Sequence, residues 1–135
     1  MNIITVQDPR LVRWVNDQLQ VNFNPEEVTT IASVEGDQLL CVVVYSRHTT
    51  YGCEMTIAST SPKWCTRKFL KEAFAYPFVQ CGYQRVTFVT TPDNPKTVSL
   101  NERLGAVYEG RLRRWFGDRD GLVYGMLKEE CRWLT

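Results

Sequence analysis

Residues 94–106 read NPKTVSLNERLGA, and the segment EGRLR follows at residues 109–113. The Asn-Pro pair at the start is typical of a turn. Residues 96–104 are then predicted to form a short helix. Gly105 ends that helix, because glycine adopts the left-handed conformation of a helix C-terminus at little cost. The segment therefore predicts a helix with a change of chain direction at each end.

Strands are predicted on both sides of this helix. Residues 85–91 alternate between two faces, as the side chains of a strand do. Residues 106–115 and 122–128 are predicted to pair as a hairpin around the turn GDRDG at residues 117–121. The second half of the chain therefore has the order β-α-β-β.

The first half of the chain is predicted to form a further helix, an antiparallel sheet and a second helix. Asp8 and Pro9 open the first helix, as N-cap and first helical residue. Pro77 lies inside the second helical pattern and should kink or shorten it. Strands are predicted at residues 2–6, 28–35, 38–47 and 53–58, a polar loop at 59–63, and a mostly helical segment at 64–80. No linker interrupts this order, so residues 1–135 are predicted to be one α/β (α+β) domain.

Composition excludes several classes of protein. The chain has 135 residues, with 16 Lys and Arg against 15 Asp and Glu, so it lacks the basic surplus that nucleic-acid binding usually leaves. No apolar run approaches the roughly 18 residues of a membrane span, and the N-terminus does not resemble a signal peptide. The five cysteines form no C-x-x-C pair, and there is one histidine, so we expect no metal site, reduced thiols and a cytoplasmic location.

Several segments, taken in order, resemble one family over the whole chain. They are Glu54–Ala58, Tyr76–Phe78, Gly82–Val86, Asn94–Ala106, Glu109–Arg113 and Tyr124–Met126. Together they resemble the GCN5-related N-acetyltransferase (GNAT) family, with a second half similar to its ribosomal-protein-alanine acetyltransferase branch and to small phage-type members. The resemblance implies a mixed sheet of about six to seven strands, splayed at its centre, with helices on both faces.

The resemblance also implies a binding site for acetyl-CoA between the splayed strands. Here those strands are residues 53–58 and 85–91. The backbone of Ile57, Ala58 and Ser59 is expected to bond the thioester carbonyl or the pantetheine arm.

The pyrophosphate is expected on the loop that enters the second helix, where exposed N–H groups and the helix dipole favour an anion. The residues concerned are Lys63, Trp64, Cys65, Thr66 and Arg67. The loop lacks the glycines usual in the family, so its side chains would do more of the binding. The alternative is that Trp64 caps the core while Lys63 and Arg67 are solvated. Asn94 is expected to bond the pantetheine arm or order its loop, with a simple turn role as the alternative.

For catalysis, Glu54 matches the position at which many relatives place a general base. The alternatives are a glutamate facing solvent or a partner for an arginine of the last hairpin. The tyrosine that often protonates the thiolate is missing near Asn101. Thr97 and Tyr108 are the candidates for that role, with Tyr124 as a further substitute; a cap or cofactor contact and ordinary strand packing are their alternatives.

The function that follows is transfer of an acetyl group from acetyl-CoA to a primary amine by direct attack. The amine is a protein N-terminus, a lysine or a small molecule, chosen by short loops such as residues 47–52 and 117–121. The alternative is a catalytically inactive acyl-CoA sensor or a protein-interaction module on the same fold. A homodimer is an expected assembly.

Overall fold

The computed structural model describes all residues, 1–135, and contains seven strands and three α-helices. The sheet has the order β1-β2-β3-β4-β5-β7-β6. The elements are β1 Asn2–Ile4, α1 Pro9–Leu19, β2 Thr29–Glu35, β3 Gln38–Ser46, β4 Gly52–Ser59, α2 Arg67–Ala75, β5 Arg85–Thr90, α3 Pro95–Leu104, β6 Val107–Leu112 and β7 Gly121–Leu127. The predicted mixed sheet within one α/β domain is confirmed.

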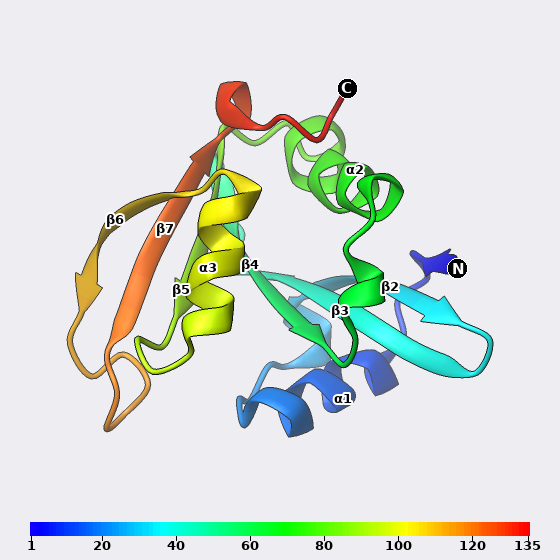
Figure 1. Ribbon diagram of the computed structural model, residues 1–135, viewed down its shortest axis with the longest axis horizontal. Coiled ribbons are helices and arrows are strands. Elements are labelled where there is room, and N and C mark those ends of the chain that lie inside the picture. The colour runs from blue at the N-terminus through cyan, green and yellow to red at the C-terminus, as the bar shows by residue number, and fades with distance from the viewer.

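The sheet divides where β4 meets β5. These two strands are parallel and pair only from Gly52 opposite Arg85 to Glu54 opposite Thr87. Beyond that point β4 continues beside β3 alone, and β5 continues beside β7 alone. Figure 1 shows the two strands separating below their shared start. The predicted splay is therefore present, and its apex lies at Glu54.

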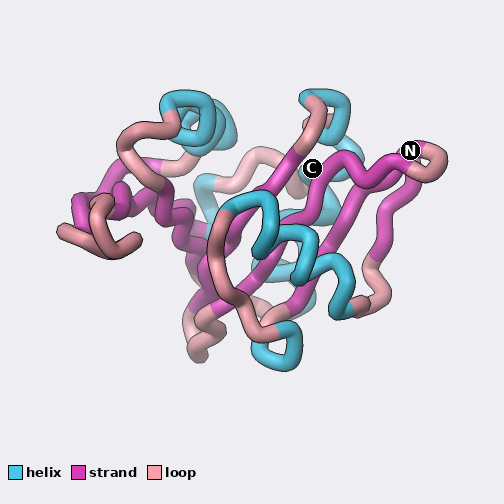
Figure 2. The backbone as a smooth tube through the Cα atoms, turned by 90° about the horizontal axis from the view of Figure 1, so that it is seen from below, coloured by secondary structure: helices cyan, strands magenta, loops and turns pink.

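Helices lie on both sides of the sheet, as Figure 2 shows. On one face, Val15 of α1 packs on β2, β3 and the end of β4. On the other face, α2 and α3 bury the larger core, which includes Phe69, Phe74 and Leu104. The first face carries no helix over β5 and β7, and this uncovered half of the sheet holds the cavity described below.

The segment predicted as one helix over residues 64–80 is three elements. A 3₁₀ turn covers Pro62–Trp64, α2 begins at Arg67, and a π-helical turn covers Tyr76–Gln80. Pro77 lies in this wide turn because it has no N–H to donate to the regular ladder. The expected shortening of the helix at this proline is confirmed.

The first strand of the last hairpin is shorter than predicted. It ends at Leu112 rather than at residue 115. The Asp120 carboxylate accepts from the backbone N–H of Arg114 at 2.7 Å and from the Arg111 side chain at 2.7 Å, which draws the chain out of the sheet. Arg114 has φ 56°, a left-handed conformation that no strand continues through. Trp115 therefore stands in a loop.

None of the helices combines the length and apolar character that crossing a membrane requires. The five cysteines are all free; Cys41 and Cys53 are buried, and Cys65 is exposed.

Candidate active site

The fork between β4 and β5 leaves main-chain groups without a neighbouring strand. Peptide groups of alternate residues in an antiparallel strand point to opposite sides. The N–H of Thr60 donates to Leu40 of β3, and the carbonyl of Tyr51 accepts from residues at the start of β5. By this alternation, Met55, Ile57 and Ser59 direct their peptide groups towards β5, which has already diverged. The fork therefore presents a row of free donors and acceptors along β4.

Of the three residues predicted to use their backbone here, Ile57 and Ser59 lie in this row. Ala58 pairs with Val42 of β3, and its side chain is buried beneath α1. Met55 belongs to the same row and was not predicted.

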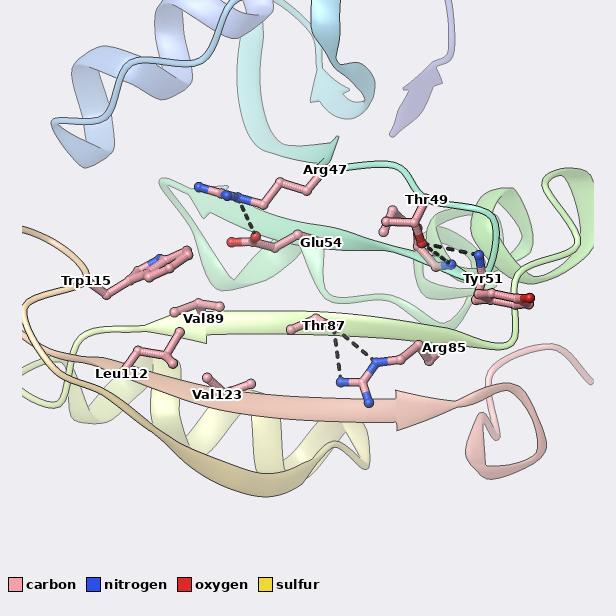
Figure 3. Close-up of a pocket in the computed structure, with 12 residues that line it drawn as sticks. Arg47, Thr49, Tyr51, Glu54, Arg85, Thr87, Val89, Leu112, Trp115 and Val123 are labelled. Carbon is pink, nitrogen blue, oxygen red and sulfur yellow. Dashed lines mark hydrogen bonds and ion pairs between the residues drawn. The ribbon is translucent and has the colours of Figure 1, made fainter.

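A cavity of about 290 Å³ opens on the uncovered half of the sheet, beside the apex of the fork. Figure 3 shows that its walls come from β4, β5 and β7 and from the loops after β3 and β6. Its polar lining includes Arg47 and Glu54 on the β4 side and Thr87 and Arg85 on β5. Its apolar lining lies at the end away from Arg85, with Trp115 beside Arg47, and consists of Val89, Leu112, Trp115 and Val123. The cavity is thus at the small end of the usual range for ligand sites and has both a polar and an apolar part.

Glu54 forms an ion pair with Arg47 at the edge of the cavity. The distance from Glu54 Oε2 to Arg47 Nε is 3.0 Å, and the Glu54 side chain is 15% exposed against 66% for Arg47. Burial raises the pKa of the Glu54 carboxyl, and the Arg47 charge partly opposes that rise. A largely buried carboxylate with a raised pKa is suited to take a proton from a substrate amine.

Trp115 lines the apolar end of the cavity, and its ring contacts the guanidinium of Arg47. The Arg47 guanidinium carbon lies 4.9 Å from the centre of the Trp115 ring, within range of a cation–π interaction. Gly121 makes room for this ring, because a Cβ there would lie 2.7 Å from Val89 Cγ1 and 3.0 Å from Trp115 Cβ. The arginine thus joins the base candidate on β4 to the loop of the last hairpin.

Arg85 also lines the cavity, and its positive charge is neutralised by Glu109. Its Nη2 lies 2.8 Å from Glu109 Oε1, and it also donates to Thr87 Oγ1 at 3.1 Å. Gly125 makes space for this pair, since a Cβ there would meet Glu109 Oε2 at 2.5 Å. The carboxylate of Glu109 on β6 is therefore occupied by an arginine of β5.

The predicted pyrophosphate loop lies at the start of α2, on the other face of the sheet. Lys63, Cys65 and Arg67 are exposed. The Thr66 hydroxyl accepts from the N–H of Phe69 at 3.2 Å and so caps the helix. The Trp64 ring is buried in the core with an edge-to-face contact to Phe69, which matches the alternative of a core role for its side chain.

The C-terminal segment reaches the same loop. Arg67 donates to the Thr135 hydroxyl at 3.4 Å and lies 6.0 Å from the ring centre of Trp133. The Trp133 indole donates to the carbonyl of Leu104 at 2.9 Å. The last residues therefore join the start of α2 to the end of α3.

Asn94 and Thr97 begin α3. The Asn94 side chain is exposed and accepts from the N–H of Thr97 at 3.3 Å, so it is the N-cap of the helix. Thr97 is half-buried, and neither residue lines the cavity.

Tyr108 lies on β6 and is 53% exposed. Its ring packs edge-on against Tyr124, whose hydroxyl contacts Glu102 of α3 at 3.3 Å. Burial, together with the Glu102 carboxylate, raises the pKa of Tyr124. The side chain of Tyr124 packs in the core beneath α3, on the opposite sheet face from Glu54. The structure therefore does not bring either tyrosine to the cavity.

The cavity residues Arg47, Arg85, Thr87 and Trp115 were not predicted individually. Alternation along residues 85–91 could have placed Arg85 and Thr87 on the Glu54 face. Arg47 and Trp115 lie in loops 68 residues apart, and no local pattern predicts their contact.

No family model matches the chain, and no curated protein matches it in sequence. Solved structures do match. Mutant forms of the spermidine/spermine N-acetyltransferase SpeG from Vibrio cholerae match with a TM-score of 0.76 at 16% identity, over 95% of this chain and 95% of that chain. The ribosomal-protein-S5-alanine acetyltransferase of Vibrio fischeri matches with a TM-score of 0.67 at 15% identity, over 92% and 72%. A putative acetyltransferase from T. thermophilus matches with a TM-score of 0.66 at 23% identity, over 86% and 65%.

These neighbours match over most of the chain. The fold implied by the sequence resemblance is thereby confirmed. The chain has the fold of the GCN5-related N-acetyltransferases.

Proposed function

We propose that the protein transfers an acetyl group from acetyl-CoA to a primary amine. The observation that carries this proposal is the position of Glu54, a partly buried carboxylate with a raised pKa, at the apex of the β4–β5 fork and at the edge of a cavity. The structural neighbours are acetyltransferases, and this also supports an enzyme rather than the non-catalytic alternative.

The residues around the fork fit the pantetheine arm and thioester of acetyl-CoA. The row of peptide groups at Met55, Ile57 and Ser59 offers the unpaired donors and acceptors that an amide-containing arm requires. Lys63 and Arg67, both exposed at the start of α2, would hold the pyrophosphate by charge. The loop has no glycine, so side chains would replace the usual close backbone approach. We also assign Asn94 to this site through its ordering of the loop before α3.

Acetyl-CoA supplies an activated acyl carbon when it is bound. Glu54 takes one proton from the substrate ammonium, which frees the nitrogen lone pair. The nitrogen then forms a bond to the acyl carbon as the bond from that carbon to sulfur breaks. A peptide N–H of the Met55–Ser59 row donates to the carbonyl oxygen while negative charge grows there.

The second proton lost by nitrogen leaves with the thiol. Thr97 and Tyr108 were the sequence candidates for delivering it, and neither lines the cavity. The thiolate therefore receives this proton from solvent rather than from Thr97 or Tyr108.

The proposal extends to assembly and location. β6 is an edge strand of the sheet, with Val107 51% exposed and Tyr108 53% exposed, which favours a homodimer through this edge. Light scattering on the wild type and on Val107→Lys tests this dimer. A wild-type dimer that becomes a monomer in the variant supports an interface through β6, and an unchanged mass excludes that interface.

Free cysteines, including exposed Cys65, favour the cytoplasm as the location of the protein.

Two measurements test the activity. Calorimetry should show acetyl-CoA binding, and release of free thiol should depend on an added amine. No binding at millimolar acetyl-CoA would exclude the enzyme. Binding without thiol release against a broad set of amines, peptides with free N-termini included, would favour the sensor.

A further inference from the structure

We propose that the acceptor is a small amine with one positive charge and an apolar, aromatic-sized body, whose ammonium takes the place that the Arg47 guanidinium holds between Glu54 and Trp115. This inference rests on the proposed function, because it names the substrate class of the same site.

The position between Glu54 and Trp115 is built to hold a cation. Glu54 provides a carboxylate 3.0 Å from the guanidinium, and Trp115 provides a ring face at 4.9 Å. A carboxylate together with an aromatic face attracts an ammonium group in the same way. The cation now there belongs to a side chain that is 66% exposed, while Glu54 is 15% exposed. Arg47 is thus the partner that can leave, and a substrate ammonium can replace it.

The cost of displacing Arg47 is small. Ion pairs at the protein surface stabilise a protein by about 0–1 kcal/mol, and the arginine of this pair is 66% exposed. An amine that also fills the cavity gains contacts that the arginine side chain does not make.

The apolar end of the cavity defines the body of the substrate. Val89, Leu112 and Val123 line it beside Trp115. A volume of about 290 Å³ suits a small molecule better than a folded protein terminus with its neighbouring chain. The substrate therefore places its ammonium group at Glu54 and its apolar body along β5 and β7.

The charges of the cavity disfavour a polyamine. Glu54 is the only carboxylate that lines it. Glu109 is engaged by two nitrogens of Arg85, at 2.8 and 3.3 Å. A second ammonium on the substrate would find no free acid in the cavity, because Arg85 already occupies Glu109, and a cation removed from water without a partner is costly. The cavity therefore selects one positive charge, even though spermidine appears in the name of a structural neighbour.

The test compares kcat/KM by thiol release at saturating acetyl-CoA for three acceptors: tryptamine, spermidine and a peptide with a free N-terminus. We expect tryptamine to exceed spermidine by at least tenfold. If spermidine or the peptide is the better acceptor, this inference is wrong while the proposed function stands. If no acceptor releases thiol, the proposed function itself fails.

Two tryptophans provide a matched pair of variants. Trp133 carries the Arg132 guanidinium at 4.6 Å, in the manner of Trp115 and Arg47, but does not line the cavity. Trp115→Leu should raise the KM for tryptamine at least tenfold and leave the KM for acetyl-CoA unchanged. Trp133→Leu should leave the KM for tryptamine within twofold. Equal effects of the two variants would overturn the assignment.

The role of Arg47 is tested on the alkaline plateau of the pH profile, which is measured separately for the wild type and for the variant. Arg47→Leu removes the competing cation, so the KM for tryptamine should fall by up to about fivefold, the factor that corresponds to an exposed ion pair. An increase in that KM would show that Arg47 contacts the substrate instead of yielding to it, and would overturn the proposal.

Discussion

Glu54→Gln separates catalysis from folding at this site. A positioned general base contributes typically 10²–10⁴-fold to a rate. Glutamine keeps the size of the side chain and accepts no proton at neutral pH. We therefore expect kcat/KM at pH 7.5 to fall at least about 100-fold, measured as thiol release with tryptamine and saturating acetyl-CoA.

The same substitution should change stability little. The Arg47 pair contributes at most about 1 kcal/mol, because Arg47 is largely exposed. Burial raises the folded-state pKa of Glu54 above its unfolded value, so the folded protein loses some stability as pH rises between those two values. Glutamine removes both the favourable pair and this unfavourable burial of charge. The melting temperature should stay within about 4 °C of the wild type, the shift that about 1 kcal/mol produces in a domain of this size.

The pH profile gives a second readout of the same residue. In the wild type, kcat/KM should fall on the acid side with an apparent pKa above that of an ordinary glutamate. In Glu54→Gln this acid limb should disappear. Full activity of the variant at pH 7.5, or an unchanged acid limb, would refute the assignment of Glu54 as the base.

Three further substitutions have distinct expected outcomes. Arg47→Leu removes the charge that lowers the Glu54 pKa, so the acid limb of kcat/KM should move to higher pH; a move to lower pH would contradict the pairing. Gly121→Ala places a Cβ 3.0 Å from the Cβ of Trp115, so the KM for the amine should rise several-fold while calorimetry shows unchanged acetyl-CoA affinity; an unchanged KM would mean that this ring does not form the substrate wall. Trp133→Leu loses the hydrogen bond from the indole to the last carbonyl of α3, so thermal unfolding should occur about 4 °C lower, as expected for about 1 kcal/mol. A melting temperature equal to that of the wild type would show that the C-terminal segment contributes nothing to stability.

Features set by local pattern were predictable from the sequence. Alternation in residues 85–91 predicted β5, and Gly105 ends α3 with φ 106°, in the left-handed conformation expected of it. Alternation along β4 also places Glu54 on the opposite face from Met55, which is buried in the core beneath α2 and α3. These predictions depend on neighbours within a few residues, which the sequence displays directly.

Features set by distant contacts were not predictable. Asp120 draws residues 113–115 out of the strand through bonds to Arg111 and Arg114, and this is why Trp115 reaches the cavity. The ion pair of Glu54 with Arg47, rather than with an arginine of the last hairpin, depends on a turn with a left-handed backbone after β3. Neither contact leaves a local pattern in the sequence.

The central claim is that the β4–β5 fork, with Glu54 at its apex, is an acetyl-transfer site. The most direct test is a crystal structure of the protein with acetyl-CoA bound. We predict the pantetheine arm between β4 and β5, the thioester carbonyl bonded to a peptide N–H in the Met55–Ser59 row, and the acetyl group opening into the cavity beside Glu54. A cofactor bound elsewhere, or an acetyl group on the opposite sheet face from Glu54, would contradict the claim.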